Sequence, residues 1–112
     1  KNKYLGGIIA PGLSLSLNTL VSKASLIPTI RLKKVDKILG KNTISAVRSG
    51  FYWGYIGLVQ NIIDKISKQT KKNYKVILTG GFSHLFAKSF KQKVVIDKDI
   101  TIKGLQKITE LL

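Results

Sequence analysis

Cysteine is absent from the 112-residue chain, which excludes disulfide bridges and thiolate metal sites. A single histidine, His84, cannot build a histidine metal cluster. Acidic residues are also scarce, and no two of them form an obvious catalytic pair at short spacing. The five acids are Asp36, Asp64, Asp97, Asp99 and Glu110. We therefore expect no complete acid–base active site here, and we assign the chain neither a catalytic residue nor a metal ligand.

Long apolar runs are missing as well, and none approaches the ~20 residues that a membrane span needs. We expect a cytoplasmic protein without a membrane partner. Apolar residues still make up 44 % of the chain, enough for a packed core, and 112 residues is the size of one small domain. The sequence opens at Lys1 and runs at once into strand-like sequence, so we expect a segment of a longer protein.

Negative charge is so scarce that the formal net charge is +15. Such a balance fits either a nucleic-acid surface or an ordinary solvated surface rich in lysine. Base readout and bidentate phosphate binding favour arginine, yet only Arg31 and Arg48 are arginine. The lysines are scattered without interleaved aromatic residues. We favour solvated lysines, with weak non-specific binding of polyanions and no specific nucleic-acid partner.

The periodicity of apolar residues and the turn signals predict a mixed α/β pattern. Residues 13–25 fit either period, because Leu13, Leu15 and Leu17 alternate as in a strand, but a helical face fits better. The predicted elements are a strand over 4–10, a helix over 13–25 that Pro28 breaks, an extended piece over 29–32, a long helix over 43–71, a strand over 74–79, a helix over 82–90, a strand over 94–96 and a helix over 101–111.

The long helix carries two different faces, and Asn42 or Thr43 can cap its start. One face is an apolar stripe formed by Ile44, Val47, Phe51, Tyr55, Leu58, Ile62 and Ile66. The other lies roughly 100° away around the helix and is formed by Thr43, Ala46, Gly50, Gly54 and Gly57. Each interior glycine costs ~1 kcal/mol relative to alanine. Close approach of another backbone or a ligand would compensate, and so would ordinary tight helix packing.

Two places can carry binding chemistry. A strand, then Gly80-Gly81, then a helix is an arrangement that suits a phosphate or nucleotide, although most such glycine pairs are plain structural turns. Thr43 lies at a helix start on the glycine face, where its hydroxyl can meet a polar ligand group or simply cap the helix. Both interpretations remain open for each place.

Several segments, taken in order, resemble the type III pantothenate kinases along almost the whole chain. The segments are 6–16 (GGIIAPGLSLS), 26–28 (LIP), 40–43 (GKNT) running on to Ala46 and Ser49-Gly50, 51–57 (FYWGYIG), 76–81 (VILTGG) and 97–105 (DKDITIKGL). Each segment is unremarkable alone, and their order and spacing make the resemblance specific. Arg48 stands where the family usually has Gln, and Ser83 stands where it usually has Ala.

The resemblance implies the fold of the acetate and sugar kinases, heat-shock ATPases and actin, with two ribonuclease-H-like halves around the nucleotide. Residues 1–112 would then be the C-terminal lobe, an α/β unit with a mixed sheet packed against helices that include one long helix. The family transfers the γ-phosphate of ATP to pantothenate and forms 4'-phosphopantothenate, the first step of coenzyme A biosynthesis. Its members are homodimers that use Mg²⁺-ATP and a monovalent cation, typically K⁺.

The resemblance also assigns roles to individual residues. Thr43 matches the threonine that contacts pantothenate, and Thr79, Gly80 and Gly81 match the turn on the adenosine side of the nucleotide. The glycine-faced helix falls where dimer contacts and substrate pocket meet. The family's catalytic aspartate, potassium-binding aspartate and phosphate loops match sequence that would precede Lys1, so this chain alone is expected to be inactive. The alternative is a non-catalytic regulatory or interaction protein of the same fold.

Overall fold

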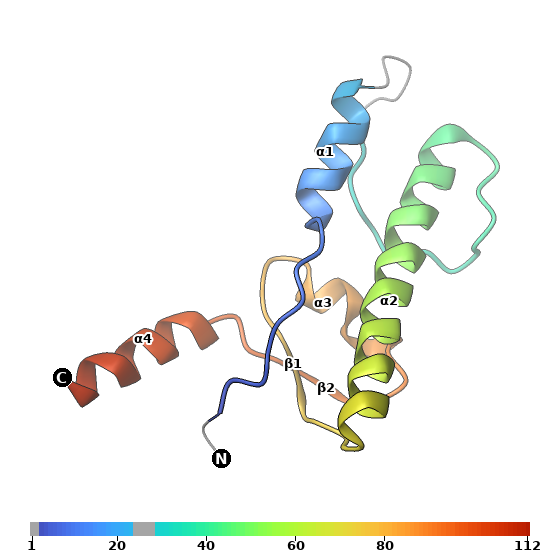
Figure 1. Cartoon of the computed structure of the whole chain (residues 1–112). Coiled ribbons are helices and arrows are strands. Elements are labelled where there is room, and N and C mark those ends of the chain that lie inside the picture. Colours follow the sequence, from blue (N-terminus) through green and yellow to red (C-terminus); the bar gives the residue numbers. More distant parts are fainter. Residues whose placement is uncertain (1–2, 24–28) are drawn as a thin grey trace.

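The computed structural model describes residues 3–23 and 29–112, and Figure 1 shows their arrangement. The predicted break at Pro28 lies outside the described residues. The elements in chain order are α1 (Leu13–Lys23), α2 (Thr43–Thr70), β1 (Val76–Leu78), α3 (Ser83–Phe86), the 3₁₀ helix η1 (Ala87–Ser89), β2 (Val94–Ile96) and α4 (Ile100–Leu111). The helices predicted at both termini and the long central helix are therefore confirmed.

Helix α2 starts with a capping box at Asn42. The Asn42 side chain accepts a hydrogen bond from the Ser45 N–H at 2.9 Å, and the Ser45 hydroxyl oxygen accepts one from the Asn42 N–H at 3.2 Å. This pairing satisfies donors that the first helical turn would otherwise leave free. The helix ends where Lys71 adopts the left-handed conformation, with φ of 56°. Of the two caps that the sequence allowed, Asn42 is the one used.

The core lies on one side of α2. Tyr52 is fully buried there, and Ser49 and Ile56 are buried on the same face. The Tyr52 ring stacks on Phe86 at 5.5 Å between centroids. Because each helical residue turns by about 100°, this buried face is rotated by roughly a quarter of a turn from the predicted apolar stripe, which is only partly covered. Elsewhere among the described residues, the buried ones are Leu13 and Leu17 of α1, Ile30 and Ser83.

The sheet consists of two parallel strands in the described part of the chain. Val76 pairs with Val94, Ile77 with Val95 and Leu78 with Ile96. The connection between them passes through α3 and η1 (Figure 1). The strands predicted over 74–79 and 94–96 are thus confirmed in shorter form, and the expected α/β architecture is confirmed in outline. No antiparallel strand accompanies them among the described residues, so the sheet is not mixed there.

The strand predicted over residues 4–10 is wrong for this structure. Residues 3–12 are described and belong to neither helix nor sheet. Backbone N–H and C=O groups of a strand need a neighbouring strand as partner, and no described segment pairs with them. The large side chains of this segment, Tyr4, Leu5, Ile8 and Ile9, are all exposed. The extended piece predicted over 29–32 also lacks strand pairing, and the helix predicted over 82–90 is divided into α3 and η1.

Candidate functional site: a glycine turn and a glycine-faced helix

The turn that follows β1, residues 79–81, is shaped by its glycines. Gly80 has a φ of +103°, a conformation that residues with a Cβ rarely adopt. The Ser83 hydroxyl donates to the Gly80 carbonyl oxygen at 2.9 Å, and Ser83 itself is buried. A Cβ built on either Gly80 or Gly81 meets nothing within 4 Å. The backbone of the turn is therefore bare toward the space beside it and is held in shape by Ser83.

A cavity of about 200 Å³ lies beside this turn, and all three residues predicted to contact the nucleotide line it. Its remaining walls are Leu13, Tyr55, Val59, Leu78, Phe82, Ser83, Phe86 and Phe90. Four of these side chains are aromatic, which suits a flat ring that can stack or pack edge-on. Whole-ligand pockets have volumes of about 300–1,000 Å³, so this cavity has room for one part of a nucleotide.

Asp97 lies next to this turn, and sequence analysis gave it no role. It follows β2 directly, and its backbone N–H donates to the Leu78 carbonyl at 2.9 Å. The Asp97 carboxylate accepts from the Lys103 ammonium at 2.8 Å and from the Asp99 N–H at 3.0 Å. The hydrogen bond from Lys103, followed by that from Asp99, lowers the pKa of Asp97 below its ordinary value of 3.8. Asp97 thereby fixes the start of α4 to the edge of the sheet where the glycine turn begins.

Thr43 lies apart from the glycine turn. It is exposed in the first turn of α2, and its hydroxyl makes no hydrogen bond to the described residues. It does not line the cavity of residues 79–81. Tyr55 does, and twelve residues of helix at 1.5 Å each place Thr43 about 18 Å from Tyr55 along α2. The structure thus puts the predicted substrate residue and the predicted nucleotide turn at two levels of the same long helix.

The glycine face of α2 is open. Gly50, Gly54 and Gly57 are exposed, and a Cβ built on any of them meets nothing within 4 Å. Gly50 and Gly54 line two hollows, one toward Phe51 and Tyr55 and one toward Ile38 and Trp53. The described chain therefore does not use these glycines for its own packing.

Tyr55 connects the glycine turn with the segment before α1. Its hydroxyl donates to the Pro11 carbonyl at 3.0 Å, and the Ser16 hydroxyl lies at the same distance. The same ring borders both the cavity of the glycine turn and the hollow beside Gly54. Sequence analysis placed Tyr55 on an apolar stripe, and its hydroxyl was the signal that could have indicated a polar contact.

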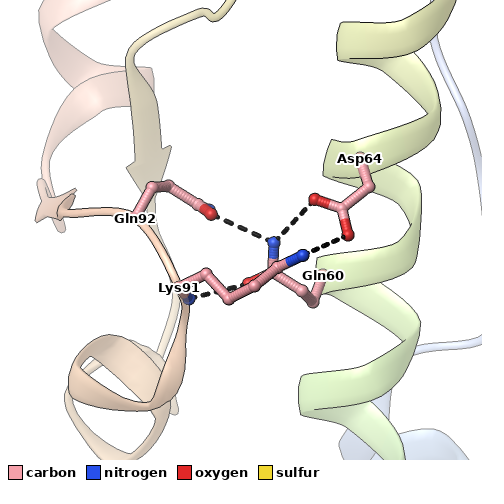
Figure 2. Close-up of polar contacts among 4 residues, drawn as sticks. All are labelled: Gln60, Asp64, Lys91 and Gln92. Carbon is pink, nitrogen blue, oxygen red and sulfur yellow. Dashed lines mark hydrogen bonds and ion pairs between the residues drawn. The ribbon is translucent and has the colours of Figure 1, made fainter.

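A cluster of four polar residues joins the middle of α2 to the segment that enters β2 (Figure 2). Gln60 donates to Asp64 and to Gln92, both at 3.0 Å, and accepts from the Lys91 N–H at 2.9 Å. The Lys91 ammonium lies 2.9 Å from Asp64 and is the main cause of the lowered pKa of that carboxyl, with Gln60 second. These contacts fix the position of β2 along α2. Because β2 pairs with β1, they also fix the position of the glycine turn that follows β1.

Comparison with known proteins places the chain in a family. The model of the type III pantothenate kinases matches residues 1–65. The chain belongs to the type III pantothenate kinase family. Its whole length is 60 % identical to the type III pantothenate kinase of Pelagibacter ubique and covers 45 % of that protein. It is 43 % identical to that of Paracoccus denitrificans over 94 % of the chain, and 38 % identical to that of Koribacter versatilis over 98 %, covering 40 % of each.

The chain thus spans less than half the length of the type III pantothenate kinases it matches. Within the described ranges, no group of three or more His, Cys, Asp or Glu side chains could hold a metal ion. No helix of the described residues is long and apolar enough to cross a membrane.

Proposed function

We propose that the protein containing these 112 residues phosphorylates pantothenate with ATP, and that this chain is its C-terminal lobe in the actin-like fold. Membership of the type III pantothenate kinase family supports the reaction. Phosphoryl transfer depends on positioning of the substrates and on charge neutralisation around the phosphates. In this proposal the chain supplies positioning, while the catalytic aspartate, the phosphate loops and the cation ligands lie elsewhere in the protein. We expect the protein to be located in the cytoplasm.

The observation that carries the proposal for this chain is the free hydroxyl of Thr43. A threonine at a helix start usually caps the helix, but here Asn42 and Ser45 already form the cap. The Thr43 hydroxyl is exposed and makes no hydrogen bond to any described residue. The Thr43 hydroxyl therefore does not cap the helix, and Thr43 matches the threonine that contacts pantothenate in the family. Together these two points support a contact between Thr43 and pantothenate.

The glycine turn supports a contact with the adenosine part of ATP. Thr79, Gly80 and Gly81 expose backbone toward a cavity with aromatic walls, and Phe82 and Phe86 are among these walls. A bare backbone lets a ring and ribose approach closely, and the aromatic walls contribute apolar area. In the proposal these three residues bind the nucleoside and leave the phosphates to other parts of the protein.

The open glycine face of α2 supports a homodimer in which a second copy packs against Gly50, Gly54 and Gly57. Interior glycines destabilise a helix by ~1 kcal/mol each relative to alanine. No described side chain compensates for this cost, because nothing lies within 4 Å of the missing Cβ positions. Close packing of a partner helix would compensate for this cost.

The test measures pantothenate phosphorylation by the full-length protein with ATP, Mg²⁺ and K⁺, and compares Thr43→Val and Thr43→Ser with the unchanged protein. Loss of one hydrogen bond to the substrate predicts that Thr43→Val raises the KM for pantothenate about tenfold. The KM for ATP and the melting temperature should stay unchanged, and Thr43→Ser should retain most activity.

The control is Thr70→Val, which changes the same side chain in the last turn of α2, where the hydroxyl donates to the Ile66 carbonyl. It should leave the KM for pantothenate unchanged. An unchanged KM for pantothenate in Thr43→Val would remove Thr43 from the site. No phosphorylation by the unchanged protein would favour the alternative, a non-catalytic regulatory or interaction protein.

A further inference from the structure

We propose that the segment before α2 forms a binding site for compact, multiply phosphorylated small molecules, separate from the glycine turn. The segment is residues 31–41, called the basic strap here. A cavity of about 460 Å³ lies between this strap and the first turns of α2. Five cationic side chains line it, namely Lys33, Lys34, Lys37, Lys41 and Arg48. None of its lining residues lines the cavity of the glycine turn.

The positive charge of the cavity is not neutralised within the described part of the chain. The ion pairs found there are Lys91–Asp64, Lys103–Asp97 and Lys107–Glu110, and none involves a lining residue. In the sequence, residues 1–63 contain nine lysines and arginines and a single acid, Asp36. A concave surface lined by one sign of charge concentrates the field and attracts counter-ions. The occupant that this field selects is an anion with several charges.

The strap is held against α2. The Arg48 side chain donates through Nε to the Arg31 carbonyl at 2.8 Å, and the Ser49 hydroxyl donates to the Ile38 carbonyl. The Lys41 N–H donates to the Ser45 hydroxyl oxygen at 3.0 Å. Gly40 lies against the backbone of Ala46 so closely that a side chain there would clash. Fixed backbone between the lysines lowers the ordering cost of binding and distinguishes this cavity from lysines spread over a surface.

The size and walls of the cavity favour a small molecule over a nucleic acid. Its volume falls within the range of about 300–1,000 Å³ found for small-molecule sites. No aromatic side chain lines it, whereas single-stranded nucleic acids are bound mainly on aromatic stacking surfaces. Lysines provide mobile point charges that match phosphate oxygens without base readout. The shared chemistry of the ligand is two or more linked phosphates, as in free tripolyphosphate or the triphosphate of a nucleotide.

The experiment is calorimetric titration of the full-length protein with tripolyphosphate, and separately with ATP, at physiological salt. The test variant is Lys33→Gln/Lys34→Gln. The matched control is Lys65→Gln/Lys68→Gln, which removes the same two charges from exposed positions farther along α2. Loss of two charge-assisted contacts predicts at least about tenfold weaker tripolyphosphate binding for the test variant, and less than about twofold for the control. Lys37→Gln provides a second, single-charge variant that should weaken binding in the same direction.

The two sources of linked phosphates are separated by the ATP titration. If the strap takes a nucleotide triphosphate, a second ATP equivalent is bound and the test variant loses it; if it takes free polyphosphate, only the tripolyphosphate affinity falls. Equal weakening by test and control variants would overturn the site, because net charge alone would then explain it. Unchanged tripolyphosphate affinity in the test variant, no tripolyphosphate binding by the unchanged protein, or tighter binding of a short oligonucleotide through the same lysines would also overturn it. None of these outcomes depends on pantothenate turnover.

Discussion

The hydroxyl of Tyr52 lies 2.7 Å from that of Ser89, 37 positions later in the chain. Tyr52 is the one fully buried large side chain in the described ranges, and its ring stacks on Phe86. This pair therefore fixes the α3–η1 connection, and with it the glycine turn, to the middle of α2.

Replacing Tyr52 with Phe tests this attachment. The ring still fills its space, but the hydroxyl of the half-buried Ser89 loses its partner. We expect the free energy of unfolding to fall by about 1 kcal/mol, the typical net value of such a hydrogen bond. The measurement is chemical denaturation of the full-length protein. Tyr74→Phe is the control, since Tyr74 is exposed and its hydroxyl bonds to no described residue; equal losses in both variants would contradict the prediction.

Replacing Gly80 with Ala tests the backbone of the glycine turn. No atom lies within 4 Å of the new Cβ, so any effect comes from the φ of +103°, which costs roughly 1–2 kcal/mol for a residue with a side chain. Gly81→Ala is the control, because its Cβ also enters open space without a positive φ. We expect lower thermal stability for Gly80→Ala only, whereas either new side chain should weaken ATP binding, because both glycines line the cavity. Equal thermal stability of the two variants would show that the conformation of Gly80 has no role.

Replacing Gly54 with Ala and with Leu tests the open face of α2. Within one copy Gly54→Ala should strengthen the helix by up to ~1 kcal/mol, because its new Cβ meets nothing within 4 Å. In the proposed homodimer, Leu would instead push the partner away. We expect sedimentation to show a dimer for the unchanged protein and a monomer for Gly54→Leu. Lys68→Leu, about 21 Å farther along the helix, is the control and should remain dimeric.

The ion pair between Asp97 and Lys103 predicts that the free energy of unfolding depends on pH. The pKa of Asp97 is lowered, so its contribution is present above the ordinary value of 3.8 and is lost as pH falls through the lower pKa of the folded state. The pKa of Lys103 is raised by the hydrogen bond to Asp97, so its contribution is present below 10.5 and is lost as pH rises through the higher folded value. Lys103 is exposed and Asp97 is half-buried, so solvent screens the pair and the effect on stability is small.

The measurement is a carbon NMR titration of the Asp97 carboxyl group. Lys103→Gln should raise its pKa toward 3.8, since the largest cause of the shift is removed. Lys107→Gln removes a neighbouring charge that pairs with Glu110 and should leave the titration of Asp97 unchanged. A titration unaffected by Lys103→Gln would mean that the ion pair does not form in solution.

The sequence by itself determined the helices, the two short strands and the family. These features depend on local signals, such as the cap at Asn42 and the glycines after β1, and such signals act between residues close in sequence. The sequence also showed that one face of α2 carries glycines, but it did not show whether other parts of the chain pack against that face.

Only the tertiary structure decided which side of α2 is buried. The regular apolar stripe through Phe51 and Tyr55 suggested one face, but Tyr52 and Ile56 are the buried residues, because α3 and η1 pack against that side. Likewise, residues 4–10 have the composition of a strand and yet form none, since a strand exists only when another segment supplies its hydrogen-bond partners. Burial and strand pairing are properties of two segments together, and the sequence of one segment does not contain them.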